Sequence, residues 1–149
     1  MNNHEVISVL NNLIETCTRG QNGFRNAAES IQNSEFRRLF NIFSQQRAQF
    51  ITELQSEVHR LGGEASKSDE ARTAPDKTIP FRPTATKVGG MRDEATVIAE
   101  CQLEEETAVN DYQEALKADL PLDVQYVVKR QYMDIKDAFD RIRILQRAA

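Results

Sequence analysis

The chain has 149 residues, of which 28% are charged, and its net charge is -4. This length is that of a single domain, which can bury a hydrophobic core without disulfides or a structural metal. The mildly acidic balance opposes nucleic-acid binding, because phosphate recognition needs clustered positive charge. Residues 1–5 lack the basic start of a signal peptide, and no apolar stretch is long enough to cross a bilayer. We therefore expect a cytoplasmic protein that binds neither nucleic acid nor membrane.

Two amphipathic helices are predicted in the first half of the chain. Apolar residues recur there at alternating steps of four and three, which is the spacing of one face of a helix. The pattern predicts helices over residues 3–32 and 34–61. Ser34 is a suitable N-terminal cap for the second helix, and Gly62-Gly63 ends it. The short break between the two helices forces them to run antiparallel.

Residues 62–92 are predicted to be a linker. They contain three of the four prolines and four of the six glycines, a composition that excludes regular helix. Such a length can cross the whole bundle, or it can form a floppy loop between helices of an up-and-down bundle. We favour the crossover, because long loops in compact domains usually have a topological reason.

The second half repeats the pattern of two helices. Helices are predicted over residues 93–118 and 121–147, with Asp93 as the first cap and Pro121 at the short break between them. Two antiparallel hairpins joined by a long crossover form the ferritin-like arrangement. The sequence thus predicts one all-α domain over residues 1–149, a four-helix bundle of ferritin-like architecture.

Ferritin-like bundles that hold two metal ions place carboxylates and Glu-x-x-His pairs at mid-height. Helix 34–61 offers Arg47 and Phe50 there, and only Glu104 of helix 93–118 is a credible ligand. The remaining inward candidates are poor metal ligands: Cys17, Gln21, Ile135, Lys136, Ala138 and Phe139. We therefore expect no metal and no other cofactor. The metal-binding alternative would need an atypical site built from Glu15, Glu104 and Glu105.

Arg47 and Glu104 are expected to meet in the core. Both fall on inward positions of their stripes, and a buried ion is costly unless it is paired. We predict an Arg47–Glu104 salt bridge, with Gln21, Gln131 or Tyr132 completing its hydrogen bonds. In the alternative, Arg47 lies at the edge of the stripe and extends its guanidinium to solvent.

Two smaller features bear on function. Cys17 and Cys101 lack metal-site spacing and are best explained as reduced core residues. Gly20 and Gly23 leave room for a cavity between helices, which would suit a small ligand. The sequence shows no catalytic triad, no paired Cys and His nucleophile and no glycine-rich phosphate loop, so we assign no catalytic residues.

Several strings resemble an uncharacterised bacterial four-helix-bundle family of the ferritin-like superfamily. They are residues 13–16 (LIET), 23–28 (GFRNAA), 47–50 (RAQF), 53–58 (ELQSEV), 61–63 (LGG), 112–116 (YQEAL) and 140–143 (DRIR). The resemblance implies a ferritin-like fold, a bacterial origin and an association with stress, but no established activity. Such proteins often carry a His where this chain has Phe139, which weakens the case for metal.

We favour a non-enzymatic bundle protein that acts through protein contacts, as a homodimer. Two alternatives remain: a ferritin-like iron or manganese oxidase or store, and a bundle that binds a small molecule.

Overall fold

The residues that the structure describes form four helices. The computed structural model describes residues 1–66 and 93–148, and these ranges contain α1 (Asn3–Ser30), α2 (Ser34–Arg60), α5 (Glu94–Lys117) and α6 (Leu122–Ala148). The described residues form no strand. The predicted all-α bundle is therefore confirmed.

Local side chains set the helix ends. At α1, Asn2 and Glu5 form a reciprocal capping box, with the Glu5 N–H donating to Asn2 Oδ1 at 2.8 Å. Asn33, rather than the predicted Ser34, caps α2, because its side-chain oxygen accepts from two backbone N–H groups of the first turn. At the other end of α2, Gly62 has φ +84, a left-handed conformation that glycine adopts without strain.

The predicted linker, residues 62–92, lies mostly outside the described residues. Its first residues pack on α1, since Asn11 Nδ2 donates to the Glu64 carbonyl at 3.1 Å and the Ser66 N–H donates to Asn11 Oδ1 at 2.7 Å. Gly63 touches the Ile7 side chain so closely that a Cβ would lie 2.5 Å from Ile7 Cδ1. The chain thus leaves α2 held against its neighbour.

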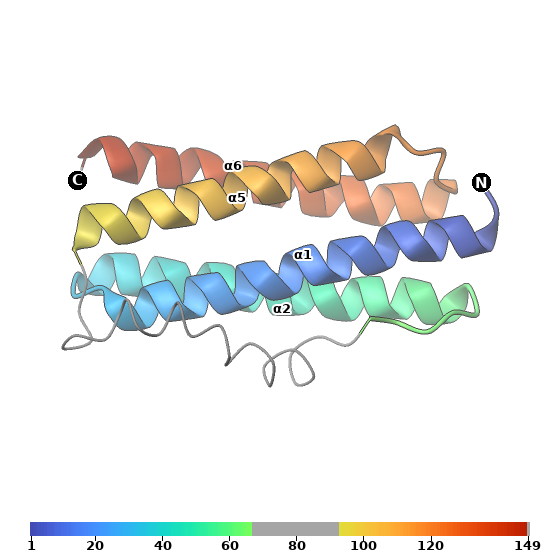
Figure 1. The fold of residues 1–149 in the computed structure, drawn as a ribbon, viewed down its shortest axis with the longest axis horizontal. Coiled ribbons are helices and arrows are strands. Elements are labelled where there is room, and N and C mark those ends of the chain that lie inside the picture. The colour runs from blue at the N-terminus through green and yellow to red at the C-terminus, as the bar shows by residue number, and fades with distance from the viewer. Residues whose placement is uncertain (67–92, 149) are drawn as a thin grey trace.

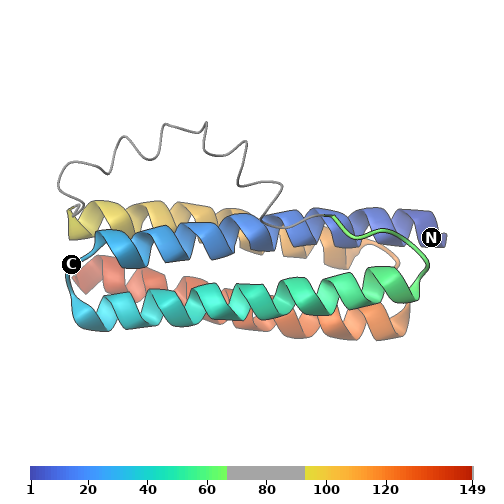
Figure 2. The ribbon, with the colours of Figure 1, turned by 90° about the horizontal axis from the view of Figure 1, so that it is seen from below.

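The helices form a square in which each packs against two others. α1 packs against α2 and α5, and α6 packs against α5 and α2, so that α2 and α5 face each other across the diagonal. α2 and α5 run in the same direction (Figures 1 and 2). The end of α2 and the start of α5 therefore lie at opposite ends of the bundle, which confirms the predicted crossover topology.

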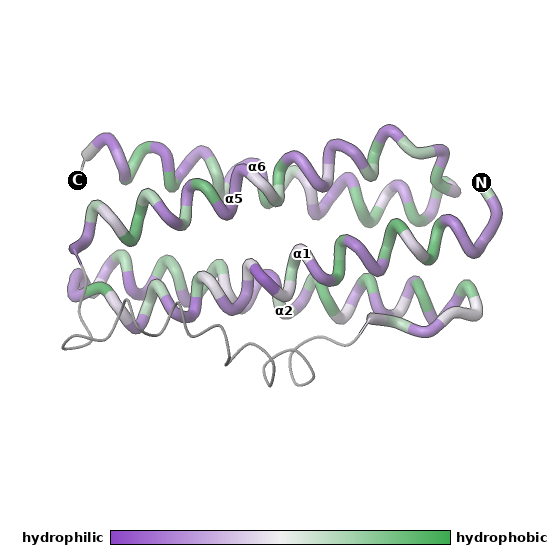
Figure 3. The backbone as a smooth tube through the Cα atoms, in the orientation of Figure 1, coloured by the Kyte–Doolittle hydropathy of each residue, from purple (hydrophilic) through white to green (hydrophobic). Residues whose placement is uncertain are grey.

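The core consists of two apolar clusters stacked along the bundle. One holds residues from the first part of α1, such as Leu10 and Leu13, and the other surrounds Phe24, Phe40 and Phe43. Hydrophobic and hydrophilic residues alternate along every helix in Figure 3, as expected when one stripe faces inward. None of the described helices is long and apolar enough to cross a membrane.

Candidate functional site

A buried ion pair lies where the two apolar clusters meet. Arg47 of α2 and Glu105 of α5 are 0% and 1% exposed. Arg47 Nη1 donates to Glu105 Oε1 at 2.8 Å, and Nη2 donates to Oε2. This bidentate pairing is the strongest interaction that a guanidinium and a carboxylate make. Because α2 and α5 are diagonal helices, the pair spans the centre of the bundle.

Helix α1 makes room for the Arg47 side chain. A Cβ added at Gly20 would lie 3.1 Å from Arg47 Nη1 and 3.6 Å from its Cγ, so the missing side chain is what admits the guanidinium. One turn further along α1, the Phe24 ring lies 5.2 Å from Arg47 Cζ, a cation–π contact. The site is therefore built by three helices around one cation.

Charge pairing offsets the burial of Arg47. Burial opposes its positive charge, but the Glu105 carboxylate and its hydrogen bonds outweigh this effect and hold the pKa of Arg47 above its ordinary value. Arg47 is therefore a buried cation, as arginine is protonated in proteins generally. A permanent cation at the centre of a bundle repels metal ions.

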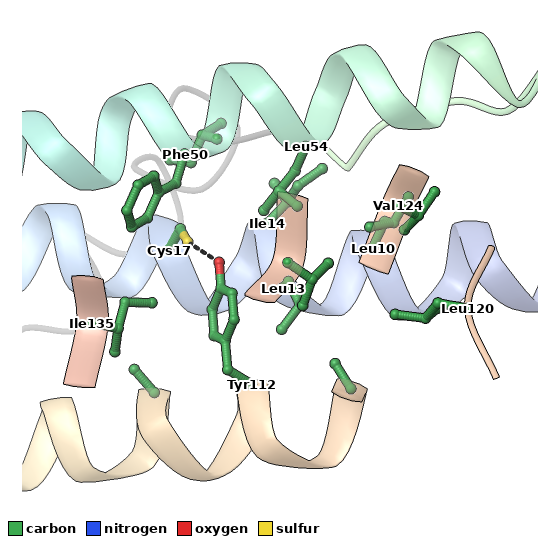
Figure 4. Packing of buried hydrophobic residues seen from close by; sticks show 14 of the residues in the cluster. Leu10, Leu13, Ile14, Cys17, Phe50, Leu54, Tyr112, Leu120, Val124 and Ile135 are labelled. Atoms are coloured by element: carbon green, nitrogen blue, oxygen red, sulfur yellow. Dashed lines mark hydrogen bonds between the residues drawn. The ribbon is translucent and has the colours of Figure 1, made fainter. Parts of the chain in front are cut away.

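A second set of hydrogen bonds leads from this layer towards the surface. Cys17 Sγ lies 3.2 Å from the Tyr112 hydroxyl (Figure 4). The same hydroxyl donates to Gln131 Oε1 at 2.7 Å. Gln131 Nε2 in turn donates to Glu53 Oε1 at 2.8 Å, and Arg130 binds the same Glu53 oxygen at 3.1 Å. Since Tyr112 gives its hydrogen to Gln131, the thiol donates to Tyr112.

Burial keeps both partners of the Cys17–Tyr112 hydrogen bond uncharged. It raises the pKa of the Cys17 thiol to about 11, and it raises the pKa of Tyr112 well above its ordinary value. Cys17 and Cys101 are both buried free thiols. A protonated, buried thiol is a poor nucleophile, so this network is suited to positioning helices rather than to covalent chemistry.

The predicted partner of Arg47 was wrong by one residue. The Glu104 side chain is 42% exposed and approaches Arg19 Nε at 3.9 Å, whereas Glu105 is buried against Arg47. From Cys101, Glu104 is three residues away and Glu105 four, and both steps return near the same helix face. The buried residues Val97 and Ile98 lie seven residues before Glu104 and Glu105 respectively, so the spacing alone does not choose between the two glutamates.

The three residues predicted to complete the hydrogen bonds of the pair bind other groups. Gln131 binds Tyr112 and Glu53, as described above. Tyr132 accepts a hydrogen bond from Gln113 Nε2 at 3.1 Å, and the Gln21 carbonyl accepts one from Ser44 Oγ at 3.0 Å. The carboxylate of Glu105 is thus satisfied by Arg47 itself.

The carboxylates of the alternative metal site do not fit a dinuclear centre. Both Glu105 oxygens bind Arg47, Glu104 lies beside Arg19, and Glu15 accepts a hydrogen bond from Ser66 Oγ at 3.3 Å. Within residues 1–66 and 93–148, no three His, Cys, Asp or Glu residues gather in a way that could hold a metal ion. Phe139 stands where similar proteins often carry a His, and its side chain packs partly buried against the core.

Side chains from other helices approach both helical glycines, and that of Arg47 comes closest. Arg47 occupies the position beside Gly20, and Glu104 Cγ lies 4.0 Å from the Cβ position of Gly23. Arg47 thus fills the space beside Gly20, on which the small-ligand alternative partly depended, whereas Gly23 has one contact at ordinary van der Waals distance.

Comparison with known proteins places the chain in a family. Residues 5–118 match the sequence model of the family described as "Domain of unknown function (DUF2383)". The chain belongs to this family. No curated protein matches it.

A solved structure supports the fold assignment of this DUF2383 chain. It is the two-domain protein containing dj-1/thij/pfpi-like and ferritin-like domains from Anabaena variabilis ATCC 29413, with a TM-score of 0.77 and 15% identity. The match covers 99% of this chain and 37% of that one. The chain thus corresponds to a part of that larger protein, and at this identity the likeness concerns the fold. The expected membership of an uncharacterised family and the expected ferritin-like fold are both confirmed.

Proposed function

We propose that this DUF2383 chain is a non-enzymatic ferritin-like bundle of the bacterial cytoplasm, whose core is closed by an ion pair where a metal centre would lie. The observation that carries the proposal is the Arg47–Glu105 pair, which is fully buried and joins the two diagonal helices. A cation takes the central position, and it uses both oxygens of the one inward carboxylate.

Because the charged groups at the centre of the bundle bind each other, the proposed action is through protein contacts. Large apolar side chains on the solvent side of the bundle support this part of the proposal. They include Leu122, Tyr126 and Met133 of α6, which are 82%, 68% and 62% exposed. The association with stress stays a prediction from the family resemblance.

Metal analysis tests the proposal. Protein purified without chelators is measured by inductively coupled plasma mass spectrometry, and its thermal unfolding is followed with and without added Fe²⁺ or Mn²⁺. We expect far less than one metal ion per chain and no rise in Tm, since a ligand that binds only the folded state would raise it. One or two iron or manganese ions per chain would refute the metal-free core.

The variant Glu105→Gln provides an internal comparison. A metal site built on Glu105 would lose its ion in this variant. In the proposed core, metal content stays at background in both proteins while the variant becomes less stable, because Arg47 loses its counter-charge.

A further inference from the structure

The outer face of α6 carries an apolar stripe along most of the helix. Leu122, Tyr126, Met133 and Ile144 are 82%, 68%, 62% and 61% exposed. At 100° per residue, Tyr126, Met133 and Ile144 lie about 40°, 20° and 40° around the helix from Leu122. The stripe therefore occupies one narrow strip about 33 Å long.

This strip points directly away from the core. The buried residues of α6 lie about 160° to 240° around the helix from Leu122: Val124, Val128, Gln131, Ile135, Ala138 and Ile142. The stripe is thus a second row of apolar side chains, interrupted by charged residues such as Lys129 and Asp137, and nothing in the fold of the described residues covers it. Solvent-facing apolar side chains in such a row are typical of an interaction surface.

The arrangement of residues about Met133 indicates what covers the stripe. Leu122 and Ile144 lie eleven residues either side of Met133, and Lys129 and Asp137 lie four residues either side. Steps of four and eleven residues return near the same helix face. A second α6 helix laid antiparallel across the first, with both Met133 residues on the two-fold axis, therefore brings Leu122 level with Ile144 and Lys129 level with Asp137.

We propose that the protein forms a homodimer through this face, with two α6 helices antiparallel about a two-fold axis at Met133. The interface is isologous, so each contact occurs twice. It has apolar pairs at both ends, a Met133 pair in the middle and two Lys129–Asp137 pairs between them. At the same spacing, Tyr126 lies level with Asp140 of the second copy, where its hydroxyl can donate to the carboxylate.

Like charges at the flanks do not oppose this pairing strongly. Arg130 and Lys136 fall at the same level, but each is partnered within its own chain: Arg130 with Glu53 at 3.1 Å and Lys136 with Asp140 at 3.1 Å. Asp137 has an Arg141 partner at 3.1 Å on its own helix. It is 63% exposed, which leaves it open to a cation from a second copy.

The inference deepens the proposed action through protein contacts by naming the partner as a second copy of the chain. It does not depend on the metal-free core, so the two fail separately. Sedimentation equilibrium of the full chain at concentrations up to about 100 µM should give twice the 17.0 kDa mass. A monomer throughout that range would overturn the homodimer and leave the metal analysis unaffected.

Charge reversal tests the antiparallel register. Lys129→Asp places Asp next to Asp137 of the second copy, twice per dimer, and should weaken dimerisation at least about tenfold. Asp137→Lys should do the same, and the double variant Lys129→Asp/Asp137→Lys should restore the wild-type dissociation constant. The matched control is Lys117→Asp on α5, a residue that is 71% exposed and away from the stripe.

Circular dichroism establishes that every variant is folded. A dimer that Lys129→Asp leaves unchanged would overturn the α6 interface. A double variant that dissociates as readily as the single ones would overturn the two-fold register about Met133. A lower dissociation constant for the double variant than for either single variant is specific to this pairing and does not follow from a general change in net charge.

Discussion

Removing one partner of the Arg47–Glu105 pair should be far more damaging than removing both. Arg47→Met leaves the Glu105 carboxylate in a site where it is 1% exposed and has lost both its donors. Breaking a buried pair in this way costs about 3 to 5 kcal/mol. Glu105→Leu strands the Arg47 cation and should cost a similar amount. For a chain of this length, that loss lowers Tm by roughly 6 to 20 °C.

The double variant Arg47→Met/Glu105→Leu should recover most of this loss. It replaces two desolvated charges with apolar side chains of similar length, a change that is often neutral or stabilising. Urea unfolding followed by circular dichroism at 222 nm gives the free energy of unfolding of all four proteins, and unchanged m-values show that the comparison is valid. The coupling energy from this cycle should be several kcal/mol, as expected of residues in direct contact.

The neighbouring carboxylate supplies the matched control. Glu104→Leu changes a side chain that is 42% exposed and pairs with Arg19 at 3.9 Å, so its effect should stay within about 1 kcal/mol. Equal losses from Glu104→Leu and Glu105→Leu would refute the assignment of the partner. Losses below about 1 kcal/mol from both Arg47→Met and Glu105→Leu would refute the buried pair altogether.

Two further experiments probe the surroundings of the pair. Gly20→Ala should destabilise the protein by about 1 to 2 kcal/mol in urea unfolding, because the new Cβ lies 3.1 Å from Arg47 Nη1. Gly23→Ala has only a 4.0 Å contact and should stabilise the helix by up to about 1 kcal/mol. The reverse order would contradict the packing described. Native Cys17 should resist thiol reagents at pH 8. Burial raises its pKa from 9.0 to about 11, so the unfolded chain releases this proton first, and stability should fall by about 2 to 3 kcal/mol between pH 9 and 11. Cys17→Ala should make that fall shallower, and an unchanged slope would contradict the burial.

The fold could be predicted because three independent sequence signals agree. Apolar steps of four and three define each helix, short breaks define the hairpins, and the Pro- and Gly-rich stretch between residues 62 and 92 separates them. The sequence determines the helix ends less well, since Asn33 and Ser34 are both good N-terminal caps for α2 and only the backbone geometry selects Asn33.

The ion pair was only half predictable for a physical reason. Arg47 stands between Phe43 and Phe50 in a clean stripe, which fixes its direction. α5 buries Val97 and Ile98 together, so its inward face is wide and admits both Glu104 and Glu105. The α6 stripe was missed although its spacing is visible in the sequence, because charged residues such as Lys129 and Asp137 interrupt it.

The position of the pair also suggests why a bundle would keep it. Within each hairpin a short turn sets the level of one helix against the other, whereas α2 and α5 belong to different hairpins and are separated by 33 residues of sequence, from Leu61 to Asp93. A slip of one turn would bring Arg47 level with Cys101 or Val109, which are buried and offer no counter-charge. We infer that the pair fixes the register of the two hairpins, as single buried polar groups do in coiled coils.

If the pair fixes the register, the double variant should keep its free energy of unfolding but lose its single arrangement of the two hairpins. Arg47→Met/Glu105→Leu makes the layer between the two clusters apolar, so the slipped register no longer buries an unpaired charge. Its amide NMR spectrum should show extra or broadened peaks for α2 and α5 even where its free energy of unfolding matches that of the wild type. A single sharp set of peaks would show that packing alone sets the register, and the ion pair would then need another explanation.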